Sequence, residues 1–106
     1  MLFKRCYNRI SPQDVKTMME TNKDAVFIDV REKDEYRAKH IPGSVNIPLG
    51  HLDMMKDALP ENKQTPVITY CLSGMRAKNA CEIISSFGYS NIYCMGGIHS
   101  WPYGLD

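Results

Sequence analysis

The sequence has few of the features that mark membrane, secreted or nucleic-acid-binding proteins. No apolar run approaches the ~20 residues that a membrane helix needs, and residues 1–7 contain no apolar core of a secretion signal. The 13 lysines and arginines nearly balance the 12 acidic residues and are scattered, without a basic stripe. We therefore expect neither a membrane nor a nucleic-acid partner.

Metal-binding and disulfide patterns are also missing. The four cysteines include no C-x-x-C pair, and none of the three histidines lies at a zinc-like spacing from them. A disulfide framework is not favoured by this pattern, although four cysteines leave one open. We expect a cytoplasmic protein whose thiols are reduced and which holds no metal.

What the sequence does contain is enough apolar residues for one core. It has 106 residues, of which 43% are hydrophobic, so we expect a single domain over residues 1–106. Short apolar segments alternate with segments of helical periodicity, which predicts an α/β fold with a parallel sheet and helices on both faces. The expected strands are 7–10, 25–30, 44–47, 66–70 and 91–95, and the expected helices are 11–22, 31–40, about 52–59 and 77–87.

The most informative stretch is Cys71-Leu72-Ser73-Gly74-Met75-Arg76-Ala77. It follows the apolar strand 66–70 and leads into a helix, so Cys71 is expected at the carboxyl end of a strand, where α/β sheets bind ligands. The N–H groups of residues 72–76 and the positive end of the helix can converge on an anion. The first anion there would be the Cys71 thiolate, the reactive form of cysteine. The alternative is an ordinary buried cysteine beside a turn.

Three charged residues are candidates for the same edge of the sheet. Arg76 opens a helix, where a cation opposes the helix dipole, so it invites a functional explanation such as binding an anionic substrate. Asp29 ends a buried strand and Arg31 follows it. These two could support the loop or the substrate, but a structural ion pair joining Asp29 or Glu35 to Arg31 is the favoured interpretation, because buried charges need partners.

The sequence resembles the rhodanese (thiosulfate sulfurtransferase) domain family. The matching pieces occur in family order over nearly the whole chain: Asp29-Val30-Arg31-Glu32, Glu35-Tyr36, His40-Ile41-Pro42-Gly43-Ser44-Val45-Asn46-Ile47-Pro48, the Cys71 loop, and Gly96-Gly97 followed by Trp101. The resemblance implies a five-stranded parallel sheet, a persulfide on Cys71, and neither metal nor organic cofactor. It implies a small sulfur donor, thiosulfate or a persulfide, and an acceptor thiol or cyanide, and it leaves open whether a partner protein takes part as a sulfur relay.

Two other functions stay open. Related phosphatases and arsenate reductases of this fold use a C-x5-R loop, whereas the arginine here follows four intervening residues and Ala77 takes the phosphatase position. The shorter loop favours sulfur. A non-catalytic binding module is the third possibility, although such modules often lose the cysteine. Lys39, Leu72 and Met75 depart from the residues common in the family, and the two apolar ones favour a hydrophobic or protein-borne donor.

The remaining candidates have structural interpretations as the default. Cys81 is expected in the core. Cys94 is expected to pack beside the Cys71 strand, with a resolving role toward an oxidised Cys71 as the alternative. Trp101 is expected to cover the core near the C-terminus or to wall the mouth of the site, and His40 to form a hydrogen bond at a helix end.

Overall fold

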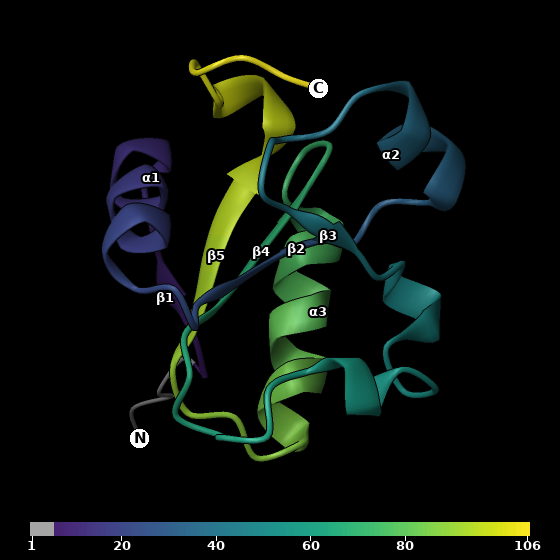
Figure 1. Ribbon diagram of the computed structural model, residues 1–106. Helices are drawn as coiled ribbons and strands as arrows, with labels where there is room; N and C mark the ends of the chain where they lie inside the picture. Colours follow the sequence, from purple (N-terminus) through teal and green to yellow (C-terminus); the bar gives the residue numbers. More distant parts are fainter. Residues whose placement is uncertain (1–5) are drawn as a thin grey trace, which may run out of the picture.

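The computed structural model describes residues 6–106 and has a parallel β-sheet at its centre (Figure 1). The sheet has five strands in the spatial order β1-β5-β4-β2-β3, and every neighbouring pair is parallel. The predicted α/β architecture is therefore confirmed. The strands are β1 (Asn8–Arg9), β2 (Val26–Asp29), β3 (Val45–Asn46), β4 (Val67–Cys71) and β5 (Ile92–Gly97).

Three α-helices connect these strands: α1 (Pro12–Thr21), α2 (Lys33–Ala38) and α3 (Met75–Ser86). The start of α1 follows the predicted signals, because the Ser11 hydroxyl accepts the Asp14 N–H at 3.1 Å and a proline occupies the first helical position. The helix α3 ends before Gly88, whose φ of +99° suits the turn that closes a helix.

The side chains of the strands alternate between two cores, one on each face of the sheet. In β4, Val67 and Cys71 face α3, whereas Ile68 and Tyr70 face the side of α1. This alternation follows from the two-residue period of a strand. Both faces of β4 are buried, as expected for the central strand of a parallel sheet covered by helices.

The expected helix around residues 52–59 was wrong. The structure has two short 3-10 turns there, η1 (Leu49–His51) and η2 (Lys56–Ala58). Leu52 and Leu59 are buried as the pattern indicated, but Met55 is 37% exposed. The burial of Leu52 and Leu59 holds this segment against the rest of the domain. Such packing does not require a continuous helix between the two leucines.

A β-bulge lies next to the carboxyl end of β4. Thr69 pairs with Cys94, but Tyr70 pairs with Gly96, so β5 has one additional residue, Met95. The strand β5 consequently extends through Gly97, which pairs with Cys71, so the strand ends in the two glycines that follow its apolar residues. Bulges re-aim a strand, and here the bulge brings the two glycines beside Cys71.

Residues 1–5 lie outside the part of the chain that the structure describes. They include the start of the expected domain 1–106 and most of the N-terminal stretch that lacks the pattern of a secretion signal. In residues 6–106, none of the helices combines the length and the apolar character needed to cross a membrane.

Candidate active site

Cys71 is the last residue of β4, and the loop that follows leads directly into α3. Its side chain is on the α3 face of the sheet, and the residue is only 1% exposed. The strand places the sulfur at the carboxyl edge, where the N-terminal end of α3 begins four residues later. The sulfur therefore lies beside the first turn of α3, where backbone N–H groups have no partner within the helix.

Two backbone N–H groups donate to the sulfur of Cys71. The Gly74 nitrogen lies 2.9 Å from Sγ and the Ala77 nitrogen lies 3.4 Å from it. Gly74 has a φ of +113°, a conformation that side chains disfavour, and this turn lets its N–H point inward. Ala77 was not among the expected donors, although its place in the first turn of a helix, where N–H groups lack intrahelical partners, is a signal for it.

The other residues expected in the cradle make no hydrogen bond to the sulfur. In the described chain, the N–H groups of Leu72, Ser73, Met75 and Arg76 donate no hydrogen bond to another protein group. Leu72 and Met75 are exposed, at 42% and 65%. The loop thus keeps N–H donors available for a group larger than the thiol itself.

The glycine pair of β5 lets the loop approach the sheet closely. A Cβ at Gly97 would lie 2.6 Å from the Leu72 carbonyl oxygen and 3.4 Å from the Ser73 Cα. A Cβ at Gly74 would be 3.6 Å from the Gly96 Cα. A side chain at Gly97 would therefore push against the backbone of the loop, which explains why this motif accompanies the cysteine loop in the sequence.

Arg76 is held by an acidic residue from a distant part of the chain. Its Nη1 and Nη2 donate to the two carboxylate oxygens of Glu35 at 2.7 and 3.1 Å. The hydrogen bonds from Arg76 are the main reason that the pKa of Glu35 falls from 4.5 to about 2. This arginine is therefore fixed beside the loop by α2, in a bidentate pair that leaves both side chains about one-third exposed.

Asp29 and Arg31 form a separate, buried ion pair. Arg31 donates from Nε and Nη2 to the Asp29 carboxylate at 2.7–3.1 Å, and the Arg31 backbone N–H donates to the same group at 2.8 Å. Burial acts to lower the pKa of Arg31, but the Asp29 carboxylate outweighs it, so the net pKa is raised. The ion-pair interpretation is confirmed for Asp29, whereas Glu35 pairs with Arg76 instead.

The His40–Pro48 motif braces the edge of the sheet. The buried Tyr70 hydroxyl accepts the Ile41 N–H at 3.1 Å and lies 2.9 Å from the Ser44 hydroxyl. The Asn46 amide donates to the carbonyl oxygens of Asp29 and Arg31, both at 3.0 Å. These bonds fix the carboxyl ends of β2 and β4 relative to each other, so the motif has a structural role next to the loop.

Cys81 and Cys94 lie behind the loop and are both buried. The Cys81 sulfur is 3.1 Å from the Thr69 hydroxyl, which also donates to the Ala77 carbonyl at 3.1 Å. The neighbouring Cys94 thiol is the first cause of a raised pKa at Cys81, and burial is the second. Cys94 pairs in register with Thr69, so it packs toward Cys81, as its default interpretation predicts.

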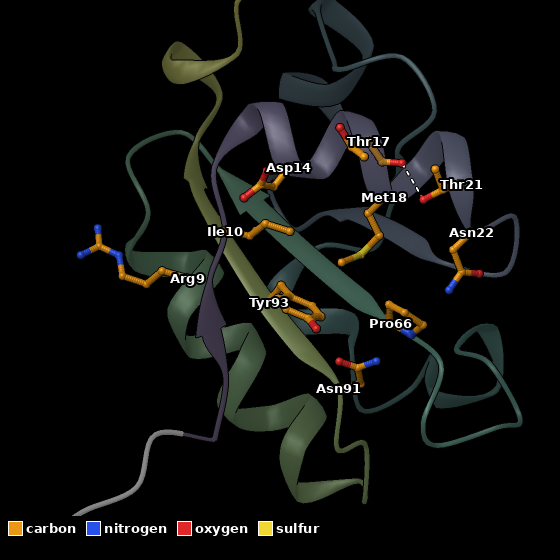
Figure 2. Close-up of a pocket in the computed structure, with 10 residues that line it drawn as sticks. All are labelled: Arg9, Ile10, Asp14, Thr17, Met18, Thr21, Asn22, Pro66, Asn91 and Tyr93. Atoms are coloured by element: carbon orange, nitrogen blue, oxygen red, sulfur yellow. Dashed lines mark hydrogen bonds between the residues drawn. The ribbon is translucent and has the colours of Figure 1, made fainter.

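A pocket of about 580 Å³ lies away from this site, between α1 and β5 (Figure 2). Its lining includes Asp14 and Asn22, and also Pro66. Its lining contains no cysteine or histidine, and Pro66 and Asn91 precede their strands at the end opposite to Cys71. Residues 6–106 also contain no group of three or more His, Cys, Asp or Glu side chains arranged to hold a metal ion.

Taken together, the sheet, the bulge and the loop define a small α/β domain with a thiol-based anion site at one edge of its sheet. The sequence model of the Rhodanese-like domain family matches residues 11–102. The chain belongs to the rhodanese-like domain family, and the predicted resemblance is confirmed.

Relatives of this chain include several proteins named as sulfurtransferases. The putative sulfurtransferase YtwF of Bacillus subtilis is 32% identical over 92 residues, which cover 87% of each chain. The thiosulfate:glutathione sulfurtransferase of Saccharomyces cerevisiae is 35% identical and covers 84% of this chain and 73% of its own length. Other relatives are longer: this chain spans only 29% of a tRNA uridine(34) hydroxylase from Buchnera aphidicola, at 33% identity.

Solved structures show the same fold. The rhodanese-related protein of Thermoplasma volcanium superposes with a TM-score of 0.79 at 28% identity, covering 94% of this chain and 98% of that one. The family model and this solved structure therefore agree on the rhodanese-like fold of the chain.

Proposed function

We propose that this protein is a thiosulfate sulfurtransferase that carries sulfur as a persulfide on Cys71. The observation that carries this proposal is the Cys71 sulfur itself, which is buried and accepts the N–H groups of Gly74 and Ala77. Hydrogen bonds to a sulfur favour its anionic form, which is the nucleophile. No metal and no organic cofactor takes part in the proposed reaction.

In the first step, the Cys71 thiolate attacks the outer sulfur of the donor. With thiosulfate, a new S–S bond forms at Cys71, the S–S bond of thiosulfate breaks, and sulfite leaves with the electron pair. With a persulfide donor, the leaving group is a thiolate. Arg76, anchored by Glu35 beside the loop, binds the anionic end of the donor in this proposal.

In the second step, an acceptor thiolate or cyanide attacks the outer sulfur of the Cys71 persulfide. The S–S bond breaks, the acceptor leaves with one additional sulfur, and the Cys71 thiolate is regenerated. Dividing one transfer into two displacements is covalent catalysis. In this proposal, the outer sulfur of the persulfide is stabilised by the N–H groups of Leu72, Ser73, Met75 and Arg76, which have no hydrogen-bond partner among residues 6–106.

The names of relatives support both kinds of substrate. One relative is named a thiosulfate:glutathione sulfurtransferase, and another, YrkF of Bacillus subtilis, is named a putative sulfur carrier protein. We extend this to a small sulfur donor and a thiol acceptor, or a partner protein that receives the sulfur. The proposed location is the cytoplasm, where thiols are kept reduced.

The structure also bears on the phosphatase alternative. Ala77 takes the position of the arginine in a C-x5-R loop, and it is fully buried beneath the loop with its N–H on the Cys71 sulfur. A longer cationic side chain has no room there without moving the loop. This supports sulfur transfer over phosphate or arsenate chemistry.

Intact mass spectrometry after incubation with thiosulfate tests the proposal. We expect an adduct of one sulfur atom, about 32 Da, that a reducing thiol removes. The Cys71→Ala variant should lack the adduct, and the matched Cys94→Ala variant should keep it. Absence of the adduct from the wild-type protein with thiosulfate and with a persulfide donor would contradict the proposal. Cys71-dependent hydrolysis of an aryl phosphate would favour the phosphatase.

A further inference from the structure

A fully buried hydroxyl group, that of Thr69, lies in strand β4 behind the Cys71 loop. Thr69 comes two residues before Cys71, so the two side chains lie on the same face of the sheet, the one that α3 covers. On this face, Val67 and Cys71 belong to an apolar core. Valine has nearly the shape of threonine, and a buried hydroxyl costs free energy unless it forms a hydrogen bond. The hydroxyl at this position therefore needs a physical reason.

The hydroxyl of Thr69 connects β4 to the first turn of α3. It donates to the carbonyl oxygen of Ala77 at 3.1 Å, and the Cys81 sulfur lies 3.1 Å from the same hydroxyl. A carbonyl oxygen can only accept, so the hydroxyl proton points to Ala77 and the Cys81 thiol is the donor in the second contact. In the regular pattern of an α-helix, the Ala77 carbonyl also accepts the N–H of residue 81. The bond from Thr69 is therefore additional to the bonds that the helix itself supplies.

Ala77 is held at both of its backbone polar groups by side chains of β4. Its carbonyl accepts from the Thr69 hydroxyl, and its N–H donates to the Cys71 sulfur at 3.4 Å. Ala77 is fully buried, in the first turn of α3. A shift of this turn along the strand would disturb both bonds. The bond from Thr69 thus opposes a movement that would take the Ala77 N–H away from the sulfur.

We propose that Thr69 is a positioning residue for Cys71, because its bond to the Ala77 carbonyl keeps the Ala77 N–H directed at the Cys71 sulfur. This inference rests on the proposed sulfurtransferase function and adds to it a residue that acts through Ala77. In the first half-reaction the Cys71 sulfur is the nucleophile. In the second half-reaction the persulfide S–S bond breaks and the same sulfur leaves as the thiolate. A donor fixed on this atom assists both steps.

Binding of the sulfur donor should depend little on Thr69. In the proposed function, the anionic end of the donor binds Arg76, whose side chain is about one-third exposed beside the loop. The Thr69 hydroxyl lies on the other side of the loop, in the interior. Its loss should therefore lower the rate of the chemical step and leave the concentration dependence on thiosulfate unchanged.

Four variants test this inference. Thr69→Val keeps the shape of the side chain without the hydroxyl, Thr69→Ala is a second variant without it, and Thr69→Ser keeps it. Cys81→Ala is the matched control, because it removes a buried side chain that contacts Thr69 but leaves the hydroxyl in place. Urea denaturation first establishes that each variant is folded under the assay conditions.

Two rates are then measured for each variant. The first is single-turnover persulfide formation over a range of thiosulfate concentrations, followed by intact mass. The second is alkylation of Cys71 by iodoacetamide, followed by peptide mass so that the other cysteines are distinguished. We expect Thr69→Val to form the persulfide on the order of tenfold more slowly at saturating thiosulfate, because the reacting group is misplaced. The half-saturating concentration should not change, and alkylation should slow by a similar factor.

The other variants decide whether this effect comes from the hydroxyl. Thr69→Ala should repeat both losses, Thr69→Ser should restore both rates, and Cys81→Ala should match the wild type. Equal rates in Thr69→Val and the wild type, or an equal loss in Cys81→Ala, would overturn the inference. Faster alkylation of Cys71 in Thr69→Val would show that the loop had only opened, and would also overturn it.

The alkylation assay separates this inference from the proposed function. Wild-type protein that forms no persulfide, with thiosulfate or with a persulfide donor, would refute the proposed function. Alkylation needs no sulfur donor, so the rates of the wild type, Thr69→Val and Thr69→Ser would still decide whether Thr69 positions Cys71.

Discussion

The two arginines at the carboxyl edge of the sheet are held by carboxylates in opposite ways. Arg31 and Asp29 are two residues apart and buried, with side chains 6% and 0% exposed. Arg76 and Glu35 are 41 residues apart and about one-third exposed. A buried pair is costly to break because the remaining charge stays in the interior, whereas a half-exposed pair is screened by water. Breaking the first pair is therefore expected to cost more stability, whereas the second pair leaves its arginine accessible.

The largest effect is expected on breaking the buried pair. Asp29→Asn keeps the shape of the side chain but leaves the Arg31 charge without a counter-charge, so we expect the free energy of unfolding to fall by about 3–5 kcal/mol. Urea denaturation measures this change. Asp24→Asn, at an exposed position, is the matched control and should have almost no effect. A loss below about 1 kcal/mol for Asp29→Asn would place this pair in the same class as a surface ion pair.

The next effect concerns the accessible arginine. Arg76→Ala removes the proposed cation for the donor, and we expect KM for thiosulfate to rise roughly tenfold, less than for a fully buried charged hydrogen bond because water screens the site. Cys71 should still react with iodoacetamide. Arg76→Lys keeps the charge but loses the planar guanidinium group, so its KM for thiosulfate should lie between those of the wild type and Arg76→Ala. An unchanged KM for Arg76→Ala would show that backbone N–H groups alone bind the donor.

A smaller effect is expected from releasing Arg76 without removing it. Glu35→Gln keeps a hydrogen-bond acceptor but removes the negative charge that competes with the donor for Arg76. The free energy of unfolding should fall by less than about 1 kcal/mol, while KM for thiosulfate should fall below the wild-type value. A rise in KM would show that Glu35 positions Arg76 and does not compete for it.

The smallest effect is the acid dependence of the same pair. The pKa of Glu35 is lowered in the folded protein from 4.5 to about 2, so its contribution to stability is fully present above pH 4.5 and is lost as the pH falls toward 2. The difference in denaturation midpoint between the wild type and Glu35→Gln should therefore shrink through this range. A difference that stays constant down to pH 2 would contradict the assignment of the effect to the Glu35 carboxylate.

The comparison of the two pairs also shows what local pattern could predict. Asp29 and Arg31 are close in sequence, and a charged residue ending an apolar strand needs a nearby partner, so this pair could be predicted. For Glu35, the local pattern indicates only Arg31 as a partner. Its real partner depends on where α2 lies relative to the start of α3, and no local pattern contains that information. The segment around residues 52–59 failed for a similar reason, because two buried leucines fit both a helix and a pair of short turns.

The candidate site also has parts that the local sequence predicts and parts that depend on tertiary packing. The β-branched and apolar residues of strand β4 and the glycine of the loop predict a cysteine at the carboxyl end of a strand, next to a helix. The roles of Leu72, Ser73, Gly74, Met75 and Arg76 in binding substrate stay predictions. The hydrogen bond from the Ala77 N–H and the close approach of Gly97 to the loop depend on how tightly β4, β5 and α3 pack together.

The sequence by itself determined the α/β alternation, the family, the place of Cys71 at a strand end and an ion pair of Arg31 with either Asp29 or Glu35. These depend on hydrophobic periodicity and on residues within a few positions of each other, which the chain fixes locally. Only the tertiary structure decided that Glu35 holds Arg76 and that Gly97 supports the loop. Each of these joins segments that are distant in sequence, and their contacts exist only once the sheet and its helices have packed.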